Sequence, residues 1–571
     1  MAVPTRDGAL LKCNVARPAG DGRWPVIVCR TPYGKDSFKS DPLMDLTGIA
    51  REGFVVVLQD VRQRFRSGGD GDFVPFVHEG ADGEDLVAWA AAQPFSTGDV
   101  FAVGASYSGV AQWAAAVRQP AALRAIAPHQ SPSNPASSLF FRGGVLELEC
   151  VVPWLLAFHV NTIMRRHAQD PAAMGRALTT LLADLDTELA SALASLPIDP
   201  LAPLARHGLD AALHDIVAGD AAQQSPMWRA LCEAQAFERV TVPALISGGW
   251  YDIFCQGAID QFIGMCTRGG SAEARERTRL IVGPWTHASQ SATQGERYFG
   301  LRSSAGAMGK GGLRGETLRF FREPVAAAPV TIFVMGANEW RDEHEWPIAR
   351  TTWTPWHLSS GGHANSLEGD GVLSADARPS AADRFDYDPA NPVPTWGGGI
   401  IGIAELAGPR DQRVIERRDD VLVYTSDVLA RDMEVTGSVV VELWAASSAV
   451  DTDFVARLVD VQPDGTAYNV ADGILRGRYR ADANVRGDGV PLVPFEPALF
   501  RIELTPTSNL FKAGHRIRLD VTSSCFPRWA RNLNVWDERG ATLADATVAH
   551  QQILHDAQFA SRVLLPVVPP R

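Results

Sequence analysis

Continuous apolar runs, rich in β-branched residues, recur along the first half of the chain. They lie at residues 25–29, 54–58 and 100–103, and the same texture returns at 242–246 and 279–282. Uninterrupted apolar runs of this length are typical of strands that are buried on both faces. The first half of the chain is therefore predicted to form a sheet with covered faces.

Helix-like segments separate these runs. Residues 82–92 are rich in alanine and place Leu86, Trp89 and Ala90 on one helical face. A strand, a helix and a strand at this spacing predict a parallel sheet with crossover helices. The fold class expected for this part is α/β.

Two further stretches have a different texture. Residues 135–238 are rich in Ala and Leu, and 172–196 carry apolar residues at helical spacing. We expect a helical insert that roofs a pocket; the alternative is a helical decoration with no role at a site. From about 355 onward, runs such as 438–444 and 516–521 stand between turn residues, which predicts an antiparallel sandwich or jelly roll.

Composition and charge exclude several classes of protein. The 571 residues carry 53 Lys and Arg against 66 Asp and Glu, a net charge of −13, which argues against nucleic acid as a partner. The seven cysteines are scattered without CxxC or zinc-type spacing, so we expect neither a disulfide framework nor a metal. The N-terminus lacks a signal-peptide profile and no run of 18 apolar residues occurs. We expect a cytoplasmic protein with no membrane partner and no cofactor.

The predicted strand at 100–103 ends in a turn of small residues that contains a serine. Gly104, Ser106, Tyr107 and Gly109 form the pattern G-x-S-Y-x-G, followed by a helix-like run at 110–117. A sharp turn between a strand and a helix lifts a serine hydroxyl above the sheet, as in a nucleophile elbow. The second glycine comes one residue later than in G-x-S-x-G, and the alternative is a glycine-rich turn without catalytic importance.

An acid and a histidine follow later strands, in the order that a serine hydrolase needs. Asp252 comes just after the predicted strand at 242–247, and His287 comes just after the strand at 279–282. A nucleophilic serine needs a base, and the base needs a group that orients it. Ser106, Asp252 and His287 are therefore the candidate catalytic triad.

The segments around these residues resemble the catalytic motifs of the CocE/NonD family of serine hydrolases, closest to its cocaine-esterase-like members, within the X-Pro dipeptidyl-peptidase (S15-like) superfamily. The resemblance covers essentially the whole chain. Its motifs are 106–109, 249–252 and 283–287, together with 59–62, Ser67, Gly69, 334–343 and 449–454.

The resemblance implies an α/β-hydrolase domain with an inserted helical cap and a C-terminal all-β jelly roll. This architecture agrees with the three textures. The expected segments are 1–134 and 239–354 for the α/β-hydrolase domain, 135–238 for the cap and 355–571 for the jelly roll.

The sequence has no His-Gly-Gly loop, the usual source of an oxyanion hole. The resemblance implies another source. In the family a tyrosine hydroxyl after an early strand serves this purpose, and Tyr33 matches its position. Together with the Tyr107 backbone N–H, it would stabilise the tetrahedral intermediate. Without the family, Tyr33 would be taken for an ordinary turn residue.

Departures from the relatives narrow the substrate. The α-amino acid ester hydrolases place carboxylates just after the catalytic acid, whereas here Asp252 is followed by Ile253, Phe254 and Cys255. An apolar or aromatic acyl group is therefore favoured over a cationic amine. Phe254 and Trp154 match aromatic positions of the acyl pocket, although both are also explained as core aromatics. Gln63 stands where relatives usually have glycine, which leaves the local turn open.

The predicted function is a cofactor-free serine esterase that acts on small-molecule esters through an acyl-enzyme. The enzymatic alternative is an amidase or acylase, including β-lactam side-chain chemistry, or an X-Pro dipeptidyl-peptidase. A further alternative is a catalytically silent protein whose jelly roll binds carbohydrate. The sequence leaves the oligomeric state open, a homo-oligomer included.

Overall fold

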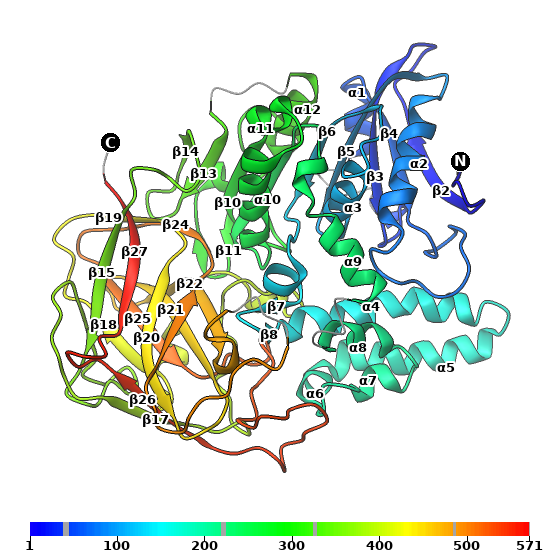
Figure 1. Ribbon diagram of the computed structural model, residues 1–571. Helices are drawn as coiled ribbons and strands as arrows, with labels where there is room; N and C mark the ends of the chain where they lie inside the picture. The colour runs from blue at the N-terminus through cyan, green and yellow to red at the C-terminus, as the bar shows by residue number, and fades with distance from the viewer. Residues whose placement is uncertain (38–44, 219–223, 324–327, 483–486, 570–571) are drawn as a thin grey trace.

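Two large sheets and a layer of helices make up the protein (Figure 1). The computed structural model describes residues 1–37, 45–218, 224–323, 328–482 and 487–569. The first sheet and its helices form an α/β domain. The helices that follow β6 form a cap beside it, and the second sheet forms an all-β domain toward the C-terminus.

The sheet of the α/β domain has ten strands in the order β1-β2-β4-β3-β5-β6-β9-β10-β13-β14. The strands from β4 through β13 pair in parallel, whereas β1, β2 and β14 are antiparallel additions at the two edges. The strands are β1 (Ala2–Pro4), β2 (Leu10–Ala16), β3 (Trp24–Thr31), β4 (Val55–Asp60), β5 (Ser96–Ala105), β6 (Leu123–His129), β9 (Leu245–Tyr251), β10 (Arg279–Thr286), β13 (Val330–Val334) and β14 (Glu339–Glu343).

Both faces of this sheet are buried, as the apolar runs predict. Along β4, Val55 and Val57 join one apolar cluster, while Val56 and Leu58 join another on the opposite face. The first cluster includes side chains of α2 (Glu79–Ala91), α3 (Tyr107–Ala116), α10 (Cys255–Arg268) and α11 (Ala272–Arg277). The second includes side chains of α1 (Leu46–Arg51) and α12 (Gly312–Arg322).

The cap lies between β6 and β9 in the chain and contains most of the remaining helices. The segment at 172–196, predicted to be helical, is divided into two α-helices by a π-helical turn. The elements are η2 (Pro135–Leu139), β7 (Phe141–Arg142), β8 (Val145–Leu146), α4 (Leu148–Arg166), α5 (Pro171–Leu182), η3 (Ala183–Thr187), α6 (Leu189–Ala194), α7 (Ala202–Ala205), α8 (Ala211–Val217), α9 (Pro226–Glu233) and η5 (Phe237–Arg239).

The all-β domain is a sheet of thirteen strands wrapped around its own apolar core. Its strand pairs are antiparallel except for one parallel pair, β16 with β18. The strands are β15 (Thr352–Ser359), β16 (Val372–Ser374), β17 (Asp383–Tyr387), β18 (Leu422–Thr425), β19 (Met433–Gly437), β20 (Val440–Ser447), β21 (Asp453–Val461), β22 (Ala467–Arg476), β23 (Ala498–Glu503), β24 (Thr507–Phe511), β25 (Arg516–Thr522), β26 (Ala549–Leu554) and β27 (Arg562–Val568).

Short elements complete the chain. They are β11 (Thr293–Gln294), β12 (Arg297–Tyr298), η6 (Leu301–Ser303), η7 (Ala404–Leu406), η8 (Gln412–Val414) and η9 (Gly477–Tyr479). Among the helices that the structure describes, none combines the length and the apolar character needed to span a membrane.

Candidate active site

The predicted site residues follow four strands of one sheet, each at the strand's carboxyl end. Tyr33 follows β3, Ser106 follows β5, Asp252 follows β9 and His287 follows β10. These strands run parallel and stand close together in the order β3-β5-β6-β9-β10. Parallel strands deliver their carboxyl ends to the same edge of a sheet, and this is where α/β proteins bind ligands.

Ser106 occupies a strained turn between β5 and α3. Its backbone φ of 56° and ψ of −124° lie in a region that residues with a side chain rarely adopt. Small neighbours permit the turn: a Cβ atom on Gly104 would lie 2.6 Å from Cβ of Ser108, and one on Gly109 would lie 2.5 Å from Cβ of Ser131. The glycine that comes one residue late is thus required where α3 passes close to Ser131.

Asp252 and His287 form a hydrogen-bonded pair. The Asp252 carboxyl is buried, and its Oδ1 accepts hydrogen bonds from the backbone N–H of Phe254 at 2.9 Å and from Nδ1 of His287 at 3.0 Å. The tautomer is assigned from this geometry: with the proton on Nδ1, the other ring nitrogen is free to accept one. The Phe254 ring packs edge-on against the imidazole, with centroids 5.0 Å apart, and limits its movement.

Ser106 and the histidine of the Asp252–His287 pair face a common cavity of about 260 Å³. Both the Ser106 and the His287 side chains line it, without a direct hydrogen bond between these two described residues. Catalytic hydrogen bonds in ligand-free sites are often long and shorten when the substrate binds. The lining residues are Tyr33, Phe76, Ser106, Tyr107, Pro132, Leu139, Phe140, Cys150, Val151, Trp154, Phe254, His287 and Ile401.

Tyr33 directs its hydroxyl toward Ser106. The hydroxyl interacts with the Ser106 side chain and accepts a hydrogen bond of 3.4 Å from Nε1 of Trp154. The Tyr33 ring stacks on Phe158, with centroids 5.6 Å apart and an interplanar angle of 11°. The cavity leaves 36% of Tyr33 exposed, yet the surrounding protein desolvates the phenol and raises its pKa. The hydroxyl therefore keeps its proton at neutral pH and remains a donor.

The Tyr107 side chain is held by hydrogen bonds to Glu79 and Phe76. Its buried hydroxyl donates to Oε1 of Glu79 at 2.9 Å and accepts from the Phe76 backbone N–H at 2.8 Å. Its backbone N–H stands at the first residue of α3, directly after the serine. Backbone N–H groups at a helix start have no partner within the helix and are suited to bind an oxyanion.

Comparison with known proteins follows the same division of the chain. Residues 7–289 match the family model of the X-Pro dipeptidyl-peptidase (S15 family), and 325–564 match that of the X-Pro dipeptidyl-peptidase C-terminal non-catalytic domain. The cocaine esterase of Rhodococcus sp. is 36% identical over 99% of this chain and 97% of its own length. The chain belongs to the CocE/NonD family. It is a serine hydrolase of the ester-hydrolase type.

Solved structures share the whole architecture of this CocE/NonD hydrolase. An aminopeptidase from a marine sediment archaeon (Thaumarchaeota) superposes with a TM-score of 0.78 at 22% identity, covering 99% of this chain and 95% of that one. An α-amino acid ester hydrolase gives 0.77 at 22% identity, over 99% and 96%. At this identity the likeness concerns the fold, and it confirms the α/β-hydrolase domain with its cap and C-terminal β domain.

The turn that carries Tyr33 is held by Asp60 and Arg64, for which the sequence analysis predicted no role. Oδ1 of Asp60 accepts the backbone N–H of Lys35 at 2.6 Å. Arg64 donates from Nε to the Pro32 carbonyl and from Nη1 to the Phe158 carbonyl, both at 2.8 Å, and so ties the turn to α4. Burial lowers the pKa of Arg64 to about 10, so it stays charged at neutral pH. The motif at 59–62 marks Asp60, but no pattern marks Arg64.

Several residues that line the cavity were not predicted from the sequence, among them Cys150 and Ile401. Cys150 comes from the first turn of α4, and Ile401 comes from a loop of the all-β domain. Neither lies in a motif or a periodic run, and only the packing of separate domains brings them to the serine. Within the described part of the chain, no group of three or more His, Cys, Asp and Glu side chains is placed to hold a metal ion.

Proposed function

We propose that this hydrolase cleaves carboxylic esters with an apolar or aromatic acyl group, through a Ser106–His287–Asp252 triad and an acyl-enzyme. One observation carries the proposal. The serine on its strained turn and the histidine paired with a buried aspartate line one apolar cavity.

Each residue has a defined part in the reaction. His287 accepts the Ser106 proton while the serine oxygen attacks the ester carbonyl, and then delivers that proton to the leaving alcohol. Asp252 keeps the imidazole in the Nδ1–H tautomer and stabilises its charged form. The Tyr33 hydroxyl and the Tyr107 N–H bind the oxyanion. Water then hydrolyses the acyl-enzyme: His287 accepts a proton from the water and returns it to the Ser106 oxygen.

The cavity wall supports an uncharged acyl group. The described residues that line it include no acidic side chain, so a substrate ammonium group would be buried there without a partner. The rings of Phe254 and Trp154 provide apolar area beside the serine. The relative at 36% identity is a cocaine esterase, which supports ester hydrolysis.

The test is hydrolysis of p-nitrophenyl acetate and benzoate by the purified full-length protein. We expect Ser106→Ala to lower kcat by about 10⁴-fold or more, as in other triad enzymes. Ser108→Ala is the matched control: its hydroxyl lies in the same turn, buried and without a hydrogen-bond partner among the described residues. Equal rates for the two variants would refute the proposed nucleophile.

Amide or X-Pro peptide hydrolysis is the second candidate, and the S15 family match favours it. The same triad serves both reactions, and only the contacts to the leaving group differ. A matched ester and amide of one acyl group separate the two. A higher kcat/KM for the amide would replace the esterase proposal.

A further inference from the structure

One wall of the cavity comes from the all-β domain, through a loop at residues 396–408. Ile401 in this loop lines the cavity together with Ser106 and His287. The base of the loop is closed by backbone hydrogen bonds between Gly398 and Gly408, at 2.8 and 2.9 Å. The loop thus reaches the cavity as a segment whose two ends are held together by backbone hydrogen bonds.

The buried carboxylate of Glu149 holds the tip of this loop. Oε1 accepts the Ile401 N–H at 3.1 Å, and Oε2 accepts the Gly402 N–H at 2.6 Å. Glu149 lies in the first turn of α4 and is 0% exposed. Charge-assisted bonds to two consecutive N–H groups fix both the position and the orientation of the segment.

Local sequence on both sides permits this close approach. Pro153 has no N–H to bond the Glu149 carbonyl, four residues earlier in α4, so that carbonyl lacks its usual helical partner. Gly402 packs directly against it: a Cβ atom there would lie 2.0 Å from the carbonyl oxygen and 2.9 Å from Cγ of Pro153. The loop can approach α4 this closely because residue 402 is glycine.

We propose that Glu149 is a positioning residue for acyl selectivity, whose ionised carboxylate holds Ile401 against the acyl group. The inference rests on the esterase function proposed above. With the carboxylate in place, a bulky acyl group gains the Ile401 contact, whereas an acetyl group is too small to need it. Loss of the carboxylate therefore weakens selectivity and leaves the chemistry intact.

Charged groups around Glu149 influence its pKa, and so the pH at which its carboxyl ionises. Glu147 precedes it and is paired with Arg142 at 3.3 Å and with Arg528 at 3.7 Å, while Arg528 also binds Asp472 at 2.6 Å. The Cys150 thiol adjoins Glu149 and has a pKa raised well above its ordinary value, so it is neutral. Both nearby guanidinium groups are thus engaged by other carboxylates.

Burial raises the pKa of Glu149 to about 7 and repulsion from Glu147 adds to this, while the N–H bonds from Ile401 and Gly402 and attraction to Arg528 oppose it. A protonated carboxyl loses the charge that strengthens these bonds and turns one oxygen into a donor, so it holds the two loop N–H groups more weakly. Acidification through pH 7 is therefore expected to release the Ile401 wall.

The first test is the ratio of kcat/KM for p-nitrophenyl benzoate to that for the acetate, measured from pH 5.5 to 8.5. The ratio cancels the ionisation of His287, because both esters use the same base in the free enzyme. In the unmodified enzyme we expect the benzoate-to-acetate ratio to fall as the pH is lowered, with a single-proton transition near pH 7. This measurement needs no variant, so it remains available if a variant fails to fold.

Variants then assign the transition. Glu149→Gln should lower the benzoate-to-acetate ratio about tenfold at pH 8 and abolish its pH dependence, with kcat for the acetate within about twofold, a contact loss of ordinary size. Ile401→Ala should give the same loss, and the double variant no further loss. A purely structural role would change stability but would not flatten the pH profile of the ratio.

Hydrogen–deuterium exchange provides a readout that does not depend on activity. Glu149→Gln should speed exchange of the Ile401 and Gly402 amides. A ratio that is pH-independent in the unmodified enzyme, or additive losses in the double variant, would overturn the proposal with the esterase function intact. Absence of Ser106-dependent ester hydrolysis would refute the esterase function, and the selectivity role with it, while exchange would still show whether Glu149 holds the loop.

Discussion

Ser106 and Gln63 both adopt a backbone with positive φ, for different reasons. Ser106, with φ of 56°, lies on the sharp turn that the proposed catalysis requires to lift its hydroxyl above the sheet. Gln63, with φ of 61°, adopts a conformation that favours glycine, the residue that the family resemblance leads us to expect there. Gln63 partly compensates the strain, because its side-chain amide donates to the Asp70 carbonyl.

The strain at Gln63 can be measured with a matched pair of variants. Both Gln63→Gly and Gln63→Ala remove the hydrogen bond to Asp70, but only glycine tolerates the positive φ. We expect the glycine variant to be more stable than the alanine variant by about 1 kcal/mol, the ordinary penalty for left-handed backbone. Denaturant unfolding measures the difference. An alanine variant as stable as the glycine variant would show that the turn relaxes.

Residues were predictable from the sequence where chemistry dictates their type and place. A serine in a small-residue turn, then an acid and a histidine after later strands, are recognisable without coordinates. Tyr33 was identified by resemblance alone. Glu149 and Arg64 could not be predicted, because a charged residue in a sequence gives no sign that it will be buried.

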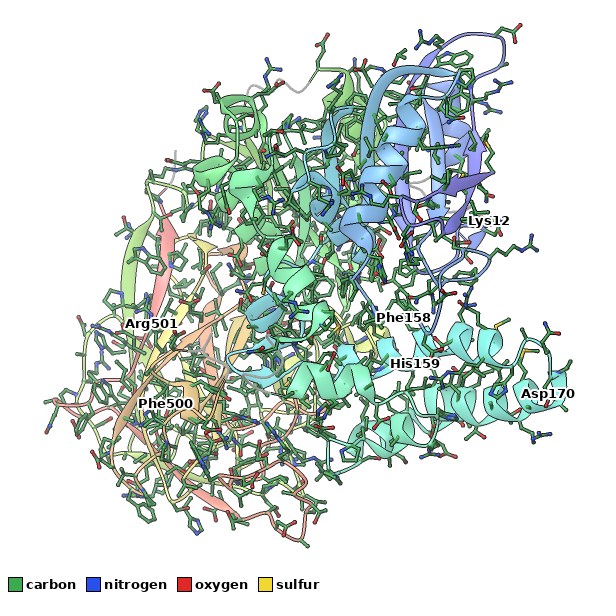
Figure 2. The ribbon with its side chains drawn as sticks, turned by 45° about the vertical axis from the view of Figure 1, so that its right-hand side comes forward. Lys12, Phe158, His159, Asp170, Phe500 and Arg501 are labelled. Atoms are coloured by element: carbon green, nitrogen blue, oxygen red, sulfur yellow. The ribbon has the colours of Figure 1, made fainter. Side chains whose placement is uncertain are left out.

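Among the elements, helix α4 has the largest part in the site. It contributes Cys150, Val151 and Trp154 to the cavity wall. It also stacks Phe158 on the Tyr33 ring and binds the loop at Gly402 through Glu149. Figure 2 shows Phe158 and His159 where the cap meets the N-terminal part of the α/β domain, and Asp170 at the far end of the cap. The position of one helix therefore affects both the oxyanion site and the acyl pocket.

The contact between α4 and Tyr33 predicts coupling in catalysis. Trp154 donates to the Tyr33 oxygen, which leaves the tyrosine proton directed at the oxyanion. Tyr33→Phe should lower kcat about 10²–10³-fold, as loss of an oxyanion donor does. Trp154→Phe, which keeps the ring and removes the N–H, should lower kcat about fivefold through orientation, within the range of one neutral hydrogen bond.

A double-variant cycle on the acetate ester tests this coupling. In the Tyr33→Phe background, Trp154→Phe should have almost no effect on kcat, since the hydroxyl that it orients is gone. An equal fold-loss in both backgrounds would show that Trp154 acts through the acyl pocket alone.

Element boundaries followed from the sequence where local pattern and tertiary contacts agree. The run at 279–282 begins β10 at its first residue, Arg279. The run at 242–246 begins three residues before β9, because Pro243 cannot donate to a ladder. Ala244 forms only an isolated bridge with Ile126, and the continuous strand starts at Leu245. The helical spacing at 172–196 did not reveal the π-helical turn at Ala183–Thr187.

At the scale of the whole molecule, the site is built where three parts meet. The Tyr251 hydroxyl at the end of β9 donates to the Asn469 carbonyl of β22 at 3.0 Å, and Arg341 of β14 pairs with Glu434 of β19 at 2.5 Å. These contacts join the α/β domain to the all-β domain. The three textures of the sequence indicated the parts, but not that the third would reach the cavity.

The junction of cap and α/β domain also predicts how the molecule responds to acid. His159 of α4 is buried there, and among the described residues its ring makes no closer polar contact than a weak one to the Leu209 backbone. Burial and the positive charges of Arg166 and Arg64 outweigh Leu209 and Asp72 and lower its pKa from 6.5 to about 4. The unfolded chain therefore binds this proton more tightly, so the stabilising contribution is present above pH 6.5 and is lost as the pH falls toward 4.

His159→Leu removes this titrating group while keeping a side chain of similar size. At pH 7.5 the variant should differ from the unmodified protein only by its packing. As the pH falls to 4.5, the difference in unfolding free energy should shift in favour of the variant, toward a limit of about 3 kcal/mol for a pKa lowered to about 4. Thermal unfolding midpoints across this range measure the shift, and other titrating groups cancel in the comparison. A difference that is constant with pH would contradict a lowered pKa of His159 in the folded protein.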